Sequence, residues 1–535
     1  MILVRYLTTL LAMAGSIAVA WSQVSYSDIL SAQNTPGDWL TYSGTYNSWR
    51  HTTLSDIRPE NVHKLAVAWM FQPPASQDRF EATPLVKDGW MYFSAQSNRV
   101  FALDARSGRQ IWSYVRRLPG SMNLCCGRVN RGLAILGDKL FLATIDAHVV
   151  ALDAKTGRVM WEVKAADYQK GYTFTGAPLV VKDKVIVGVT GGEYGARGFI
   201  DAYFAESGKP AWRFHTIPGP GEPGNETWAG DSWKTGGAPA WLTGSFDPEL
   251  NLLYWGIGNP GPDHWIADRK GDNLYSNSVV ALDPDQGRLT WYFQFTPNDA
   301  HDYDSTLIPV LLDADYAGQA RKLLAVANRN GFFYLLDRTS GEFLRAKQLT
   351  RVTWAKGIDK TGRPIPNPEA VPTATGIDVC PGVLGATNWM SPSFSPVTNL
   401  FYLTLHEACR RHFGLPQEFE EGQSFWGGAH QKIPGSPEWG ALRAVDPLTG
   451  ETQWEFRYPH TAFAGVLSTS TGMVFSGDGD GNFFAAEGRS GEILWHLPTG
   501  GSICASPMSF AVDGRQHISV ASQNALITFA LPKDR

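Results

Sequence analysis

The segment from Thr296 to Ser305 carries three carboxylates, those of Asp299, Asp302 and Asp304, within six residues. An ordinary acidic loop is a weak explanation, because three close carboxylates repel one another unless a cation compensates their charge. Asp302 and Asp304 are two positions apart, so on an extended strand their side chains would point to the same side. Two carboxylates on one side can bind a hard cation through oxygen. This segment is therefore a candidate metal site.

Two further polar segments follow apolar strands. Thr190-Gly191-Gly192-Glu193 comes directly after the apolar run 185–189, and Asn259 lies in a glycine-rich segment after Trp255. Taken alone, each segment fits a solvated turn, because glycine and asparagine are common turn residues. Together with the acidic segment, they would gather carboxylate and amide oxygens in loops on a rigid scaffold, where functional sites are usually built.

Cys125 and Cys126 are adjacent, and the loop after them contains Arg128 and Arg131. Three explanations stay open: coincidence, two separate buried thiols, or a disulfide between neighbours. A bond between neighbours closes a strained ring, and proteins keep such strain mainly where it serves a site. The arginine-rich loop favours a functional role. Of the other cysteines, Cys504 is expected to be a buried apolar residue.

A repeat that could position these segments runs through the chain. In six copies a glycine stands six positions after the first residue and a tryptophan ten positions after it, as in Ala102–Trp112 and Ala151–Trp161, whereas the copy that ends at Trp69 has lost its front half. The tryptophan positions are 69, 112, 161, 212, 291, 345, 454 and 495, and Arg345 replaces the tryptophan in one copy. Each copy combines an apolar strand, an Asp–Gly turn and a second strand, with no convincing amphipathic helix between copies. This pattern predicts an all-β, eight-bladed β-propeller. Its tryptophans would pack between neighbouring blades.

Two long gaps between copies predict insertions, one within Arg213–Trp255 and one within Leu349–Glu438. Long loops on a rigid ring are where a site is usually built. The last strands, 517–520 and 527–529, have no repeat after them. We expect them to pair with an N-terminal strand, which would close the ring and remove free edges.

The ends of the chain and its composition limit the function classes. Residues 1–22 are predicted to be a secretory signal peptide, because Arg5 precedes an apolar run that ends at Ala18-Val19-Ala20. Residues 23–535 are predicted to form a single propeller domain. The apolar run is too short for a stable membrane anchor, so we expect a periplasmic protein. The net charge is −5 and there is no basic run, which argues against nucleic-acid binding. The sequence contains no Cys-x-x-Cys-His motif, so we expect no c-type haem to be attached to this chain.

The repeat and these segments together resemble the quinoprotein alcohol dehydrogenases, the methanol and ethanol dehydrogenase family that uses pyrroloquinoline quinone (PQQ). The resemblance covers nearly the whole chain after the signal peptide. It implies PQQ on the axis of the propeller, oxidation of primary alcohols, with aldehydes as a further substrate class, and a separate soluble cytochrome c as electron acceptor. It also implies a disulfide between Cys125 and Cys126 over one face of the quinone, and a second one between Cys380 and Cys409.

The resemblance also implies roles for single residues. Asp302 would take up the proton of the alcohol, Arg329 would bond to the reactive quinone oxygens, and Trp241 would stack on the second face of the quinone. The other PQQ contacts that it implies are Glu81, Arg131, Thr175, Thr190, Gly191, Gly192 and Asn388. The metal ligands that it implies are Glu193, Asn259, Asp302 and Asp304. One departure is Phe463, which stands where the family commonly has a tryptophan in the pocket wall.

Asp304 bears on the identity of the metal. In the calcium-dependent branch of the family, the position two after the catalytic aspartate is usually small, whereas the lanthanide-dependent branch has an aspartate there, as this chain does. Glu193, Asp302 and Asp304 would balance a trivalent ion and would leave excess repulsion around a divalent one. We therefore expect lanthanum, cerium or praseodymium. In the alternative, Asp304 bonds to nearby backbone and the chain is a calcium-dependent quinoprotein ethanol dehydrogenase.

A non-catalytic scaffold for outer-membrane assembly is a more distant alternative, because such proteins share the eight-bladed repeat. They lack the cysteine pair and the acidic segment, and they carry a lipid-modified cysteine. This sequence differs from them in each respect, which favours an enzyme. The sequence does not fix the preferred alcohol, and a homodimer is one assembly that it leaves open.

Overall fold

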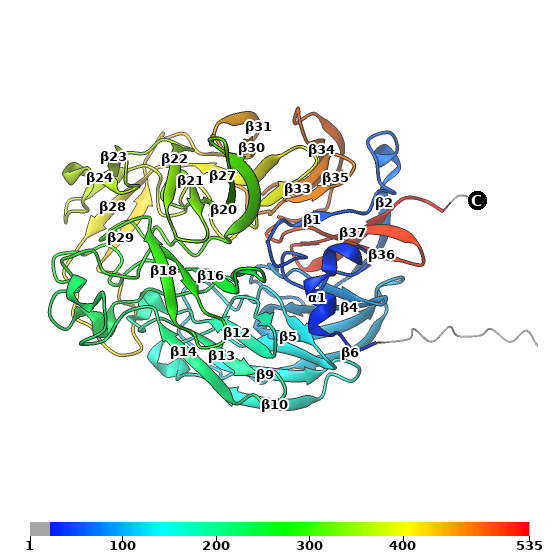
Figure 1. Cartoon of the computed structure of the whole chain (residues 1–535), viewed down its shortest axis with the longest axis horizontal. Coiled ribbons are helices and arrows are strands. Elements are labelled where there is room, and N and C mark those ends of the chain that lie inside the picture. The colour runs from blue at the N-terminus through cyan, green and yellow to red at the C-terminus, as the bar shows by residue number, and fades with distance from the viewer. Residues whose placement is uncertain (1–21, 534–535) are drawn as a thin grey trace, which may run out of the picture.

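The computed structural model describes residues 22–533, and almost all of their regular structure is β-sheet. Within these residues, eight sheets of four or five strands follow one another around the molecule in chain order (Figure 1). Each of the eight repeat positions lies on an edge strand of a different sheet. The all-β fold class is therefore confirmed, and the repeat marks the sheets one by one.

The strands of the first four sheets are β3 (Leu85–Lys87), β4 (Trp90–Ala95), β5 (Arg99–Asp104) and β6 (Gln110–Val115); β7 (Ala134–Leu136), β8 (Lys139–Ala143), β9 (His148–Asp153) and β10 (Val159–Lys164); β11 (Leu179–Val181), β12 (Lys184–Gly188), β13 (Phe199–Phe204) and β14 (Pro210–His215); and β15 (Ser245–Asp247), β16 (Leu252–Gly256), β17 (Ser278–Leu282) and β18 (Leu289–Gln294).

The strands of the next three sheets are β19 (Val310–Tyr316), β20 (Gln319–Ala327), β21 (Phe332–Asp337) and β22 (Phe343–Gln348); β26 (Ser393–Ser395), β27 (Leu400–Glu407), β30 (Trp439–Val445) and β31 (Thr452–Tyr458); and β32 (Leu467–Thr469), β33 (Met473–Gly477), β34 (Asn482–Glu487) and β35 (Ile493–Pro498), to which β1 (His51–Thr52) is added. The helical elements are α1 (Tyr26–Leu30) and the short 3-10 turns η1 (Ala32–Asn34), η2 (Val62–Lys64), η3 (Gln96–Asn98), η4 (Tyr168–Lys170), η5 (Gly192–Tyr194), η6 (Asn225–Thr227), η7 (Ser232–Thr235) and η8 (Pro368–Ala370).

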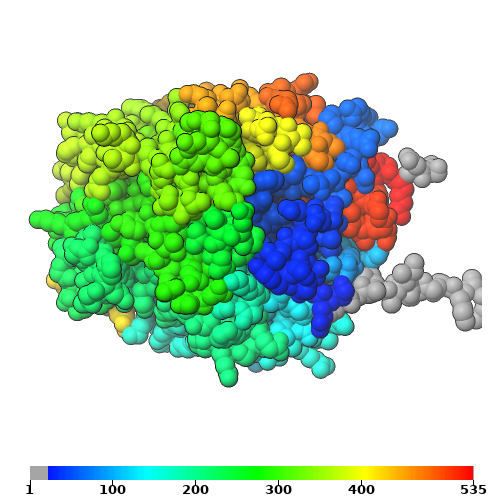
Figure 2. Space-filling view, in the orientation of Figure 1, coloured from blue at the N-terminus to red at the C-terminus, as the bar shows by residue number. Residues whose placement is uncertain are grey.

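The eighth sheet joins the two ends of the described chain. It contains β36 (Met508–Val512), β37 (Arg515–Ser522) and β38 (Ala525–Ala530), and β38 pairs with the N-terminal strand β2 (Ala66–Phe71). N-terminal and C-terminal residues accordingly lie side by side at one edge of the space-filling view (Figure 2). The predicted closure of the ring is confirmed, and it covers an edge of β38 that would otherwise be free to pair.

Six of the seven repeat tryptophans pack on the glycine of the following copy, whereas Trp495 packs on Phe483 and Phe529. The indole N–H of Trp112 donates to the Ala154 carbonyl at 3.0 Å, and a β-carbon on Gly157 would come within 2.5 Å of the Trp112 ring. The same two contacts are made by Trp69 with Ala105 and Gly108, Trp161 with Ala205 and Gly208, Trp212 with Pro284 and Gly287, Trp291 with Arg338 and Gly341, and Trp454 with Gly488 and Gly491. The predicted packing between neighbouring sheets is confirmed. In the copy with Arg345, Gly450 packs on Lys347 instead.

The insertions are divided more finely than predicted. Residues 216–244 form the first insertion and carry η6 and η7, but residues 257–277, between β16 and β17, form a further long loop outside the predicted range. The range 349–438 contains the small sheets β23 (Ala355–Ile358) with β24 (Pro364–Pro366), and β25 (Ile377–Val379) with β28 (Arg410–Gly414) and β29 (Gly428–Lys432). It also contains β26 and β27 of the main ring. The repeat marks only the edge strand and its turn, so it could not show where the inner strands interrupt an insertion.

The expected signal peptide lies outside the described residues except for Ser22. Within residues 22–533, no helix has the length and apolar character needed to cross a bilayer.

We expect Gly157→Ala to lower the apparent melting temperature, because the added methyl group would overlap the Trp112 ring. Overpacking of this kind typically costs about 1–3 kcal/mol. Gly137→Ala is the matched control, since Gly137 also has a positive φ, 62° against 71°, but has no atom within 4 Å of the added carbon. Comparing the melting temperatures of the two variants by calorimetry separates the effect of backbone strain from the effect of overlap with the Trp112 ring. Equal losses would show that the tryptophan contact is not what the glycine protects.

Candidate active site

Most of the predicted site residues line one cavity of about 360 Å³. The predicted residues in its wall are Glu81, Cys125, Cys126, Arg131, Thr175, Thr190, Glu193, Trp241, Asp302, Asp304, Arg329 and Asn388. They come from segments that precede or follow strands of six different sheets, so the ring gathers them although they are far apart in the sequence. Gly191, Gly192 and Asn259 are not in the wall. A cavity of this size is within the usual range for a small-molecule site, about 300–1,000 Å³.

Both implied disulfides are present. Cys125 is bonded to Cys126 and Cys380 to Cys409, whereas Cys504 is free and buried, as predicted. The sulfur atoms of Cys125 and Cys126 lie within 4.8 Å of a carboxylate oxygen of Glu193. Because both sulfurs belong to a disulfide, they are not thiolate ligands. The disulfide is instead a wall of the cavity beside Glu193.

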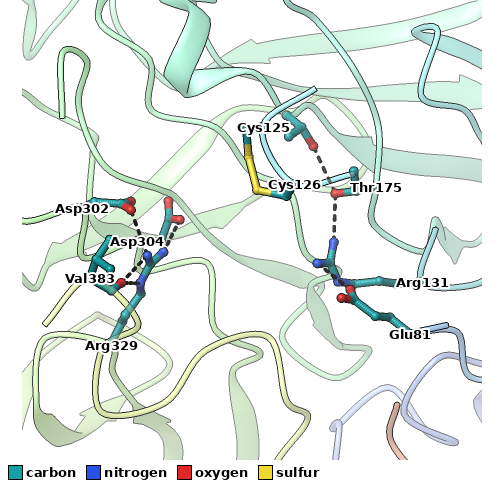
Figure 3. The surroundings of a disulfide bond; sticks show 10 residues. Glu81, Cys125, Cys126, Arg131, Thr175, Asp302, Asp304, Arg329 and Val383 are labelled. Atoms are coloured by element: carbon teal, nitrogen blue, oxygen red, sulfur yellow. Dashed lines mark hydrogen bonds and ion pairs between the residues drawn. A yellow bond between two sulfur atoms is a disulfide. The ribbon is translucent and has the colours of Figure 1, made fainter. Parts of the chain in front are cut away.

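One side of the cavity is built around Arg131. Its guanidinium pairs with the Glu81 carboxylate at 2.8 Å and donates to the Thr175 hydroxyl at 2.9 Å (Figure 3). Burial raises the pKa of Glu81, and the charge of Arg131 opposes that rise. The guanidinium also lies 4.9 Å from the centre of the Trp241 ring. Hydroxyl groups, a guanidinium and an aromatic face together suit a planar anion.

The opposite side of the cavity is built around Arg329. Its guanidinium donates to the Asp304 carboxylate at 2.6 Å and to the Asp302 carboxylate at 3.0 Å, as Figure 3 shows. It also donates to the Val383 carbonyl at 3.1 Å through Nε. The second oxygen of Asp304 accepts the backbone N–H of Asn259 at 3.0 Å. Arg329 therefore neutralises part of an acidic cluster that also includes Glu193.

This cluster has more negative charge than its contacts compensate. Burial and the neighbouring Asp304 raise the pKa of Glu193 to about 7. Burial also raises the pKa of Asp302 and of Asp304, although Arg329 opposes the rise in both. One oxygen of Glu193 is buried and accepts no hydrogen bond from the described residues. Buried carboxylate oxygens without donors are what a hard cation binds, so these residues fit a metal ion.

The third carboxylate of the acidic segment has a different role. Asp299 accepts the backbone N–H groups of His301 at 2.9 Å and Tyr303 at 2.7 Å. Burial raises the pKa of Asp299, but the His301 side chain and these two backbone N–H groups lower it below its ordinary value. Asp302 lies between His301 and Tyr303 and has a left-handed backbone conformation, with φ of 62°. The sequence suggested an extended strand here, but Asp302 and Asp304 both reach the Arg329 guanidinium from a loop. Asp299 thus holds the loop rather than a cation.

Comparison with known proteins agrees with the geometry. The family profile described as "Glucose/ethanol/alcohol dehydrogenase, beta-propeller domain" matches residues 39–353. Quinoprotein alcohol dehydrogenase PedH of Pseudomonas putida is 38% identical, over 94% of this chain and 89% of that protein. The chain belongs to the PQQ-dependent alcohol dehydrogenases. This membership does not support the scaffold alternative, although a profile described as outer membrane protein assembly factor BamB matches residues 438–533.

Two further matches in the family carry a metal in their names. The lanthanide-dependent methanol dehydrogenase of Methylacidiphilum fumariolicum is 36% identical, over 96% of this chain and 89% of that protein. A solved structure titled "Europium-containing methanol dehydrogenase" has a TM-score of 0.88 and 32% identity, and covers 94% of this chain and 100% of that one.

The sequence did not point to three residues of this dehydrogenase's site. Arg79 and Trp389 also line the cavity, and the Arg79 guanidinium lies 4.8 Å from the ring of Phe463. Phe463, the departure from the family pattern, stacks on Trp389 with ring centres 4.8 Å apart. Asp263 is buried, and its carboxylate accepts a hydrogen bond from the Asn259 side chain. An acidic residue four positions after a candidate ligand was the available signal for Asp263, whereas no motif marks Arg79.

We expect the stability of the metal-free protein to fall as pH rises from about 5 to about 8. The pKa of Glu193 is raised from its ordinary 4.5 to about 7, so between these values the folded protein binds more protons than the unfolded one. Stability then decreases with rising pH until Glu193 is ionised. Melting temperatures of protein dialysed against a chelator measure this slope.

Glu193→Gln should flatten the slope, and Glu420→Gln, which removes an exposed carboxylate, should leave it unchanged. Added lanthanum should raise the melting temperature most at high pH, because a cation favours the ionised carboxylates. An identical slope in wild type and Glu193→Gln would contradict the assignment.

Proposed function

We propose that this chain is a periplasmic quinoprotein dehydrogenase that oxidises primary alcohols with PQQ and a lanthanide ion and passes electrons to a separate soluble cytochrome c. The observation that carries the metal assignment is Asp304, which adds a third carboxylate to those of Glu193 and Asp302 in the wall of one cavity. The names of two family members, which mention a lanthanide and europium, add support. A separate cytochrome is proposed because the sequence has no motif for c-type haem.

The residues of the cavity suit PQQ. When bound, PQQ would supply a planar quinone that accepts two electrons from the alcohol carbon. Its carboxylates would be met by Arg131, Thr175 and Thr190, where a guanidinium and two hydroxyl groups already form a connected set. The ring would lie between Trp241 and the Cys125–Cys126 disulfide. Asn388 would add an amide contact. Gly191 and Gly192 lie outside the cavity wall, and Gly171 and Pro239 fill the space that their side chains would take, so their predicted contacts with PQQ would have to be made by backbone atoms.

Asp302 is the proposed general base. Its side chain is partly buried, with 19% exposed, and its carboxylate accepts one hydrogen bond from Arg329 in the cavity wall within the acidic cluster. Burial raises its pKa, which makes it a stronger base than an exposed aspartate. Arg329 would orient this carboxylate and donate to the quinone oxygens. Glu193, Asn259, Asp302 and Asp304 would hold the metal.

Calcium dependence is the second candidate, and one contact favours it. Asp304 accepts a backbone N–H from Asn259, which is the kind of contact expected if Asp304 served only as a structural residue. Its other oxygen is paired with Arg329. The two candidates are separated by which ion supports turnover.

We expect turnover of primary alcohols, measured with an artificial electron acceptor, only after PQQ and a light lanthanide are added together. Lanthanum, cerium or praseodymium should give high rates and calcium alone low rates, since three carboxylates balance a trivalent ion. NAD should not replace PQQ, because the sequence has no glycine-rich dinucleotide motif. Full activity with calcium and no gain from lanthanides would place the enzyme in the calcium branch.

We expect Asp302→Asn to reduce kcat by about 10²–10⁴-fold, because it removes the base without changing the shape of the side chain. Asp304→Ala should instead lose the response to lanthanides. The absorbance of bound PQQ shows whether each variant still holds the cofactor. An Asp302→Asn variant that binds PQQ and metal and retains wild-type rates would exclude Asp302 as the base.

A further inference from the structure

Asp263 lies just outside the cavity, in the loop 257–277 between β16 and β17. Its side chain is buried, with 4% of the residue exposed, and its carboxylate accepts the Asn259 side-chain N–H at 2.9 Å. No lysine or arginine of the described chain lies within ion-pair distance of it. Arg269, whose charge acts on Asp263 from beyond ion-pair distance, donates instead to the Pro262 carbonyl and to the side chain of Asn273. Asp263 is therefore not part of a structural ion pair.

The hydrogen bond from Asn259 fixes the orientation of a proposed metal ligand. An ionised carboxylate only accepts hydrogen bonds, so the NH₂ group of the Asn259 amide must face Asp263 and its oxygen must face away. The backbone N–H of Asn259 donates to Asp304 at 3.0 Å, so Asn259 is held between two carboxylates. A metal ion binds the amide oxygen and not the NH₂ group. Without this hydrogen bond, Asn259 could turn either its amide oxygen or its NH₂ group toward the metal.

Asp263 also changes the charge of the cluster. When ionised, Asp263 adds a buried negative charge next to the proposed ligand Asn259, which lies between Asp263 and Asp304. The attraction between a fixed negative charge and a bound ion grows in proportion to the charge of that ion. Asp263 should therefore contribute more to binding a trivalent ion than to binding a divalent one.

We propose that Asp263 is a positioning residue that holds the Asn259 oxygen toward the metal and favours a trivalent over a divalent ion. This inference rests on the proposed function, since it assumes that Glu193, Asn259, Asp302 and Asp304 bind a metal. It adds a residue that acts through Asn259 and through its charge, without being a ligand itself.

The test is calorimetric titration of the PQQ-loaded protein with lanthanum and, separately, with calcium. Loss of a residue that orients a metal ligand typically costs about 10–100-fold in metal affinity. We expect Asp263→Asn to lose lanthanum affinity in this range and calcium affinity by a smaller factor. Asp268→Asn is the matched control, because it removes the same charge from the same loop at an exposed position. Asp268→Asn should bind both ions as wild type does.

Asp263→Glu keeps the charge but moves the carboxylate, so it should weaken both ions by similar factors and keep the wild-type preference for lanthanum. PQQ absorbance and the melting temperature show that each variant is folded. Unchanged lanthanum affinity in Asp263→Asn, or equal losses for the two ions, would overturn the inference. If the wild-type protein itself does not bind lanthanum, the proposed metal assignment fails and this inference fails with it.

Discussion

The contact on which the rest of the molecule depends is that of a tryptophan on the glycine of the next repeat. Trp112 illustrates it: the ring covers Gly157 and the indole N–H reaches the Ala154 carbonyl at 3.0 Å, so apolar burial and a directed hydrogen bond fix the same pair of sheets. Six sheet-to-sheet junctions use both contacts. These junctions hold the sheets in fixed positions relative to one another. Loops from distant parts of the sequence therefore meet at one cavity, which is lined by residues from Glu81 to Asn388.

The fixed positions of the sheets and loops also allow several carboxylates to lie close together in the cavity wall. Carboxylates as close as those of Asp302 and Asp304 would move apart in a flexible loop, because their repulsion is strong where water is excluded. Here the loop is held by Asp299, whose carboxylate accepts two backbone N–H groups, and by Arg329, which pairs with both aspartates. The repulsion is therefore retained, and together with burial, the larger effect, it raises the pKa of Asp302. A site with more carboxylates than neighbouring cationic groups is suited to binding a cation.

Regular spacing and residue type made part of the structure predictable from the sequence. The period of glycine and tryptophan marked every main sheet and the closure by β2, and the adjacent cysteines and the acidic segment marked the cavity. Without the resemblance to a known family, the residues alone could not separate the roles of Asp299 and Asp302, because that difference comes from a left-handed residue in a loop that has no periodic pattern. The sequence also missed Asp263 and Arg79, whose importance comes only from what lies beside them: Asn259 in one case, and Trp389 with Phe463 in the other. Contacts between insertions are set by tertiary packing, which leaves no local signal.

The balance of charge gives the most direct argument about the metal. The cluster contains four carboxylates, those of Glu193, Asp263, Asp302 and Asp304. Arg329 pairs with Asp302 and Asp304, and Arg269 acts on Asp263 from beyond ion-pair distance, so the ionised carboxylates outnumber the guanidinium groups. Buried net charge is costly, and protonation is one way to remove it. The pKa of about 7 for Glu193 is a sign of that route. A bound cation would compensate this excess without bound protons, and each carboxylate attracts a trivalent ion more strongly than a divalent one. The excess of carboxylates over cations, more than any single ligand, is thus what supports the proposal of a lanthanide rather than calcium.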